Sequence, residues 1–106
     1  MTFDDYQAAA RRTVNPALDA DDRLLDAASG LAEEAGEILA HVRKTRFQQK
    51  PIDRGEVVLE LGDALWCLAT IAASLGVSLG EVAARNVEKL RRRYPDGFRG
   101  STDESF

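Results

Sequence analysis

The stretch RGEVVLELGDALWCLATIAASLG, residues 54–76, decides the fold because it is the most apolar part of the chain. From residue 57 onward, its side chains are apolar, small or hydroxyl-bearing, with only Glu60 and Asp63 as exceptions. On a helix these apolar side chains point all round the axis, which is typical of a helix buried in a core. Asp53 is a suitable N-cap, and the closing glycine is a suitable C-terminal stop. We therefore predict a buried helix here.

Three further helices are predicted around this segment, each from a start signal and an apolar period of 3.6 residues. They are a first helix from Thr2 that Asn15-Pro16 ends, a long second helix from residues 19–22 to about Lys44, and a last helix from a Ser78–Glu81 capping box to about Arg93. No alternating stretch of strand length is present in the sequence. The prediction is an all-α domain over residues 1–98, a four-helix bundle that oligomerisation completes or extends, with residues 99–106 as a disordered tail.

Composition excludes several classes of protein. The chain has 106 residues, and its 14 Lys and Arg against 18 Asp and Glu give a net charge of −4, which argues against a general nucleic-acid binder. Residues 64–73, the least polar run, span about half of the roughly 20 residues that a membrane helix needs, so we predict no membrane span. The first 20 residues carry charges in place of a signal-peptide core, and we expect a cytoplasmic protein. A domain this small benefits from association, which favours a homodimer or homotetramer.

Five carboxylates lie in two clusters without nearby basic residues. Glu60 and Asp63, three residues apart, share one face of the predicted buried helix, while Glu33, Glu34 and Glu37 lie on the helix before it. The sequence has no Lys or Arg at residues 24–42 or 55–84. Buried carboxylates need a cation or must protonate.

The hairpin geometry brings the two clusters together. Glu37 and Glu60 each lie roughly 11 to 12 Å from the hairpin end at 1.5 Å rise per residue, so antiparallel packing sets them at one level. Oxygen ligands in this number, without His or Cys, fit Mg²⁺ or Mn²⁺ better than zinc. The competing interpretation is a solvated acidic face, which suits Glu33, Glu34 and Glu37 but not the pair on the apolar helix.

A basic cluster follows on the last predicted helix. Arg85, Lys89, Arg92 and Arg93 recur at helical spacing, with Asn86 beside them. They are either phosphate-binding residues or a solvated basic face that stabilises a helix C-terminus. His41 has no partner in the sequence that suggests catalysis, and Cys67 is interpreted as a small core residue.

The motifs GLAEEAGE (residues 30–37), ELGD (60–63) and NVEKLRRRYPDGF (86–98) occur in this order with 22 residues between Glu37 and Glu60. In these motifs the chain resembles the MazG-like all-α nucleoside triphosphate pyrophosphohydrolases. The resemblance covers roughly residues 20 to 98, most of the chain.

The resemblance implies metal-dependent hydrolysis of a nucleoside or deoxynucleoside triphosphate to the monophosphate and pyrophosphate. It implies metal ligands at Glu34, Glu37, Glu60 and Asp63, and phosphate contacts from Asn86, Lys89 and Arg93. Glu33 would orient or deprotonate the attacking water, or hold a further metal. Two alternatives remain at this point: an enzyme of the same fold acting on phosphoribosyl-ATP, and a non-catalytic helical interaction module.

Overall fold

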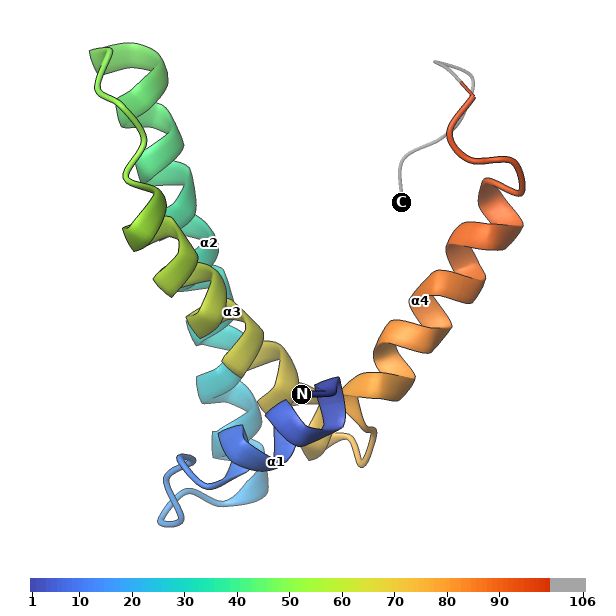
Figure 1. Ribbon diagram of the computed structural model, residues 1–106. Helices are drawn as coiled ribbons and strands as arrows, with labels where there is room; N and C mark the ends of the chain where they lie inside the picture. The colour runs from blue at the N-terminus through green and yellow to red at the C-terminus, as the bar shows by residue number, and fades with distance from the viewer. Residues whose placement is uncertain (100–106) are drawn as a thin grey trace.

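A computed structural model describes residues 1–99 as four α-helices, with no strand in that range. The helices are α1 (Phe3–Arg11), α2 (Ala20–Gln48), α3 (Arg54–Ser74) and α4 (Leu79–Arg93), as Figure 1 shows. The prediction of an all-α fold with four helices is therefore confirmed. Of the tail predicted over residues 99–106, residues 100–106 lie outside the described part of the chain.

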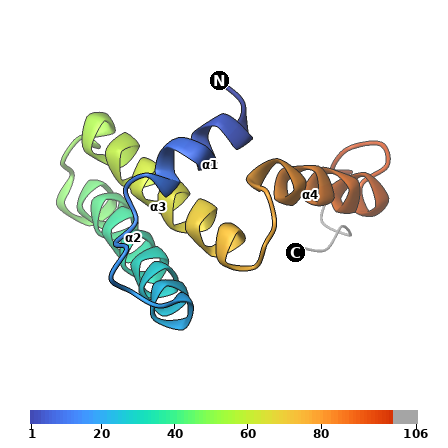
Figure 2. The same cartoon turned by 90° about the horizontal axis from the view of Figure 1, so that it is seen from below.

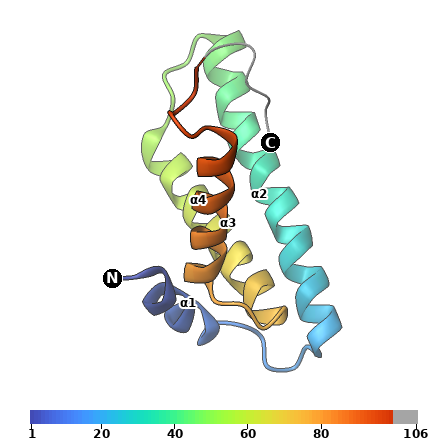
Figure 3. The same ribbon diagram turned by 90° about the vertical axis from the view of Figure 1, so that its right-hand side faces the viewer.

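Helices α2 and α3 form a long antiparallel hairpin (Figures 1 and 3). Asp19 caps α2 and Asp53 caps α3, each accepting a hydrogen bond from the backbone N–H three residues on. The two helices approach closely at Gly30, where an added Cβ would lie 3.0 Å from the Sγ atom of Cys67. Ala27 beside this point is fully buried, and Cys67 is buried as predicted. Small residues thus hold the hairpin together at its middle.

Helix α1 crosses α3 and fixes the start of α4. The buried side chain of Gln7 donates from Nε2 to the carbonyl oxygens of Ala69 (3.1 Å) and Val77 (3.2 Å), and its Oε1 accepts from the N–H of Leu79 at 3.0 Å. Asp4 accepts from the N–H of Gly80 at 2.9 Å, which places a negative charge at the positive end of α4. Two side chains of α1 therefore hold the N-terminus of α4 in place.

Helix α4 leaves the hairpin instead of packing along it. It contacts α1 and α3, but within residues 1–99 it makes no contact with α2. Figure 1 shows the result, a V whose arms are the α2–α3 hairpin and α4, and Figure 2 shows from below that α4 lies apart from α2. The described chain is therefore an open arrangement of four helices, and the completion of the bundle by oligomerisation stays a prediction.

The prediction that α3 is buried all round is wrong for a single chain. Only Cys67, Ala69, Thr70 and Ala72 of α3 are buried. Val58 and Leu59 are 62% and 65% exposed, because no second layer of helices covers this side of the hairpin. The central core consists of Ala10, Ala69 and Leu79, against which Tyr6, Leu65 and Trp66 pack. Among the described residues no large side chain is fully buried.

By length and composition alone, α3 is long and apolar enough to cross a membrane. It is the one helix among the described residues that meets this criterion. One such helix is weak evidence, because core helices of soluble proteins pass the same test. Glu60 and Asp63 lie near its middle, where charged side chains are costly in a bilayer.

Candidate metal centre

The five predicted acids occupy the middle of the hairpin. Glu33, Glu34 and Glu37 belong to α2, and Glu60 and Asp63 to α3. Glu34 and Glu60 are half-buried, whereas Glu33, Glu37 and Asp63 are exposed. The two half-buried carboxylates come from different helices, so the hairpin places one acid of each cluster toward its interior.

Glu34 shows that the two clusters share one electrostatic environment. Its pKa is raised, first by the loss of hydration on partial burial and then by the negative charges of the other acids. Those acids are, in decreasing order of effect, Asp63, Glu60, Glu37 and Glu33. The pKa of the Cys67 thiol is also raised, first by burial and then by the charges of Glu34, Asp63, Asp26 and Glu33. The charges of acids on both helices therefore act on Glu34.

Glu60 has a partner that the sequence analysis missed. The Nε2 atom of His41 lies 3.3 Å from Oε1 and 3.2 Å from Oε2 of Glu60. Both side chains are largely shielded, with 21% and 14% of their surfaces exposed. No signal in the sequence indicates this partner, because it lies on the neighbouring helix.

The length of α2 explains this pairing. The sequence predicts an end near Lys44, but α2 continues to Gln48, about 6 Å or one helical turn further. The chain turns only at Gln49, which adopts a left-handed backbone conformation with φ 54°. The hairpin end moves by this turn, so Glu60 faces His41, and Glu37 lies one turn away along α2. The prediction that Glu37 and Glu60 lie at one level is therefore wrong.

The carboxylates are of the right chemical type for a hard divalent cation, but their side chains do not meet at one point. Within residues 1–99, no three His, Cys, Asp or Glu side chains are close enough together to hold a metal ion as they stand. The Oε2 atom of Glu60 is buried and has no hydrogen-bond partner among the described residues. A buried carboxylate oxygen with unused lone pairs is suited to a cation, and carboxylates are the ligands that Mg²⁺ and Mn²⁺ prefer.

The predicted phosphate-binding residues lie on the other arm of the V. Asn86, Lys89 and Arg93 belong to α4, which does not contact α2. Two neighbours on this helix form exposed ion pairs, Arg85 with Glu81 at 3.1 Å and Arg92 with Glu88 at 3.9 Å. One chain therefore does not bring the basic helix to the α2 acids.

Two aromatic residues, Trp66 and Tyr6, pack against the core of the fold. The indole Nε1 of Trp66 donates to the hydroxyl of Thr13 at 2.7 Å, and its ring packs against the core, which supports a structural role. Tyr6 of α1 lies near Asp63, whose charge, after burial, raises the pKa of the phenol. Sequence reasoning missed Tyr6 because nothing in the chain order places α1 beside α3.

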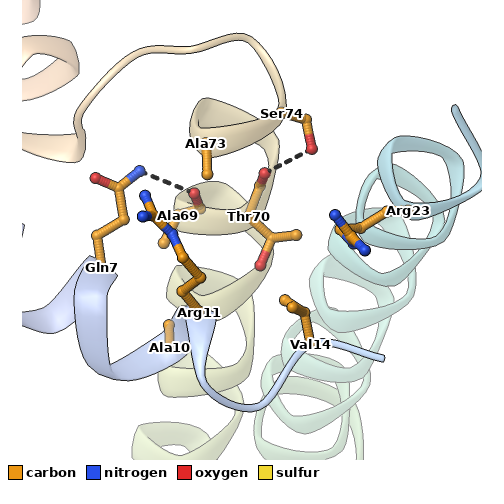
Figure 4. A pocket seen from close by; sticks show the side chains of 9 residues that line it. All are labelled: Gln7, Ala10, Arg11, Val14, Arg23, Ala69, Thr70, Ala73 and Ser74. Carbon is orange, nitrogen blue, oxygen red and sulfur yellow. Dashed lines mark hydrogen bonds between the residues drawn. The ribbon is translucent and has the colours of Figure 1, made fainter. Parts of the chain in front are cut away.

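A cavity of about 160 Å³ lies between α1, α3 and the start of α2 (Figure 4). Its lining includes Arg11, Arg23 and Thr70. Along α2, the buried Ala27 separates Arg23 from the acids, so this cavity is distinct from the acidic cluster. Arg11 lies in the last turn of α1, where a cation offsets the helix dipole.

Comparison with known proteins agrees with this architecture. Residues 24–98, which include all eight predicted site residues, match the MazG nucleotide pyrophosphohydrolase domain. The chain is also 36% identical over 112 residues to the gene 37 protein of Mycobacterium phage L5, and the alignment covers 97% of this chain and 98% of that protein. No solved structure matches the chain. The helical hairpin, its acidic motifs and the extent of the match lead to one conclusion: the chain belongs to the MazG nucleotide pyrophosphohydrolase family.

Proposed function

We propose that this protein hydrolyses a nucleoside or deoxynucleoside triphosphate to the monophosphate and pyrophosphate, with Mg²⁺ or Mn²⁺ as cofactor. The observation that carries the proposal is the placement of five carboxylates on the facing helices α2 and α3, where the charges of the other four act together on Glu34. No Lys or Arg occurs on the hairpin at residues 24–42 or 55–74 to neutralise them. A site that concentrates uncompensated negative charge is suited to a divalent cation and its phosphate ligand.

Glu34, Glu37, Glu60 and Asp63 would hold the metal in this proposal, and Glu33 would orient or deprotonate the attacking water. The metal, when bound, polarises the phosphate chain and stabilises the charge of the leaving pyrophosphate. Glu33 is exposed next to Glu34, so its carboxylate is accessible to a water molecule that approaches the metal ligands. Glu33 would accept the proton of the attacking water, and because this water is the nucleophile, the protein needs no nucleophilic side chain of its own.

Asn86, Lys89 and Arg93 would bind the phosphate chain from a second copy of the protein. The α4 that carries them does not contact α2 of its own chain, and Val82 and Val87 on the same helix are exposed. Exposed apolar residues also lie on the two helices of the hairpin, and they are Leu25, Leu39, Val42, Phe47, Val58, Leu59, Leu61 and Leu68. A basic helix and an acidic hairpin, each with an uncovered apolar surface, are complementary in charge and in hydrophobicity. We therefore propose a homo-oligomer, a dimer or a tetramer, in which α4 of one copy completes the site of another.

Anion-exchange chromatography of reactions with a panel of triphosphates tests this function. With Mg²⁺ or Mn²⁺, a preferred substrate should give monophosphate and pyrophosphate in equal amounts without a diphosphate intermediate. Including phosphoribosyl-ATP in the panel separates the two enzymatic candidates. Orthophosphate with accumulating diphosphate would contradict the pyrophosphohydrolase proposal, and no turnover of any nucleotide would favour an interaction module.

A further inference from the structure

His41 contacts Glu60 in a way that leaves one carboxylate oxygen open. A carboxylate can only accept hydrogen bonds, so the N–H of the imidazole Nε2 is the donor in this contact. It forms a hydrogen bond to Oε1 at 3.3 Å. Oε2 lies 3.2 Å from the same nitrogen, yet it has no hydrogen bond and is buried. The imidazole thus holds the carboxylate by one oxygen, and the lone pairs of the other oxygen remain unused.

The contact restricts the orientation of Glu60. The pair spans two helices, and both side chains are mostly buried, so their rotation is limited by the packing of the hairpin. The side chain of Glu60 has three rotatable bonds, and without His41 no hydrogen bond would limit their rotation. The other acids of the cluster, which also act on Glu34, repel its carboxylate. Mutual repulsion favours rotamers in which the carboxylates point away from one another. A donor on one oxygen opposes that movement.

We infer that His41 is a positioning residue that holds Glu60 in the orientation needed to bind the metal ion. This inference rests on the proposed function, because it requires Glu60 to be a metal ligand. Hydrogen bonds from neighbouring side chains commonly fix ligating carboxylates, and their loss lowers metal affinity by about 10- to 100-fold. His41 acts through Glu60 and does not itself bind metal or substrate.

The experiment measures Mn²⁺ binding by isothermal titration calorimetry to the full chain without substrate. His41→Leu removes the donor, whereas His41→Gln places an amide Nε2 near the position of the imidazole Nε2 and preserves a donor. His41→Asn serves as a second variant without the contact, since its amide is one carbon too short to reach Glu60. Thr45→Ala is the matched control, because it removes a hydrogen bond to the carbonyl of His41 (3.2 Å) and leaves the ring untouched.

We expect His41→Leu and His41→Asn to bind Mn²⁺ at least about tenfold more weakly than the wild type, while His41→Gln and Thr45→Ala keep most of the affinity. Equal affinity of the wild type and the Leu and Asn variants would overturn the inference and leave the proposed function intact. A wild type that binds no Mn²⁺ would overturn the metal-dependent function itself. Nitrogen coupling in the electron spin-echo spectrum of bound Mn²⁺, absent in His41→Gln, would show that His41 is a direct ligand and would also overturn the positioning role.

Discussion

His41 and Glu60 face each other across the α2–α3 hairpin, with the imidazole Nε2 3.2 Å from the carboxylate Oε2. The relationship sets the register of the whole acidic cluster, because antiparallel helices that meet at this pair carry Glu37 one turn away from Glu60. Glu34 lies two turns from His41 along α2. Of the acids that raise the pKa of Glu34, Asp63 on the facing helix has the largest effect. The cluster is therefore staggered along the hairpin instead of lying at one level.

Divalent metal should stabilise the wild type. The acids repel one another without a cation, so bound Mg²⁺ or Mn²⁺ should raise the melting temperature. By linkage, the free energy of unfolding should increase by about 2.7 kcal/mol when the free metal is at 100 times its Kd. Scanning calorimetry in chelator and in millimolar metal measures this shift. The double variant Glu60→Gln, Asp63→Asn should lose the shift and be no less stable than the wild type in chelator. A wild type without any shift would support the solvated-face interpretation of the acids.

Glu34→Gln should stabilise the metal-free protein at neutral pH. Folding raises the pKa of Glu34, so its charged form disfavours the folded state, and its contribution to stability is lost as pH rises through the folded pKa. The variant carries no charge at this position at any pH. Its melting temperature in chelator should exceed that of the wild type at pH 7, and the difference should shrink as pH falls below the ordinary range for Glu. A difference independent of pH would show that packing, and not charge, is responsible.

The helix starts could be predicted from the sequence because each is a local signal. Thr2, Asp19, Asp53 and Ser78 all cap the helices that were predicted from them. The end of α2 could not be predicted, because residues 45–48 are compatible with either a helix or a loop, and tertiary context decides. Because the predicted α2 is one turn too short, Glu60 is expected opposite Glu37, and its contact with His41 is not predicted.

The exposure of α3 and the direction of α4 depend on contacts between distant parts of the chain. Apolar side chains all round α3 predicted burial, but burial requires a covering layer that one copy lacks. The direction of α4 follows from Gln7 and Asp4, more than 70 residues earlier. No periodicity within α4 indicates these contacts. The roles of the predicted site residues stay predictions.

Gln7→Leu should destabilise the protein and disorder the start of α4. The substitution removes three hydrogen bonds and leaves the buried N–H of Leu79 without its acceptor. An unsatisfied buried polar group costs about 1 to 3 kcal/mol. Urea unfolding should show a loss of at least about this size. Gln48→Leu on the exposed end of α2 is the control, and a similar loss there would mean that the Gln7 hydrogen bonds do not matter.

Lys89→Ala should weaken substrate binding and leave metal binding nearly intact. In the proposed site its ammonium contacts phosphate, while the carboxylates alone bind the metal. Calorimetric titration with Mn²⁺ and, separately, with a non-hydrolysable triphosphate in the presence of Mn²⁺ measures both affinities. Arg91→Ala, which removes an exposed positive charge from the same helix outside the proposed site, is the matched control and should change neither. Loss of metal affinity together with substrate affinity in Lys89→Ala would contradict the assigned role.

Mixing two inactive variants should restore activity if α4 of one copy completes the site of another. Lys89→Ala keeps intact acids and Glu60→Gln keeps an intact α4, so a heterodimer has one complete site and one site with both defects. Equal mixing after subunit exchange gives half heterodimers, and about one quarter of the wild-type activity is expected. Pyrophosphate release measures the recovery, and each variant alone is the control. In a site built within one chain every site would carry a defect, so the absence of any recovery in exchanged mixtures would show that Lys89 acts on the acids of its own chain.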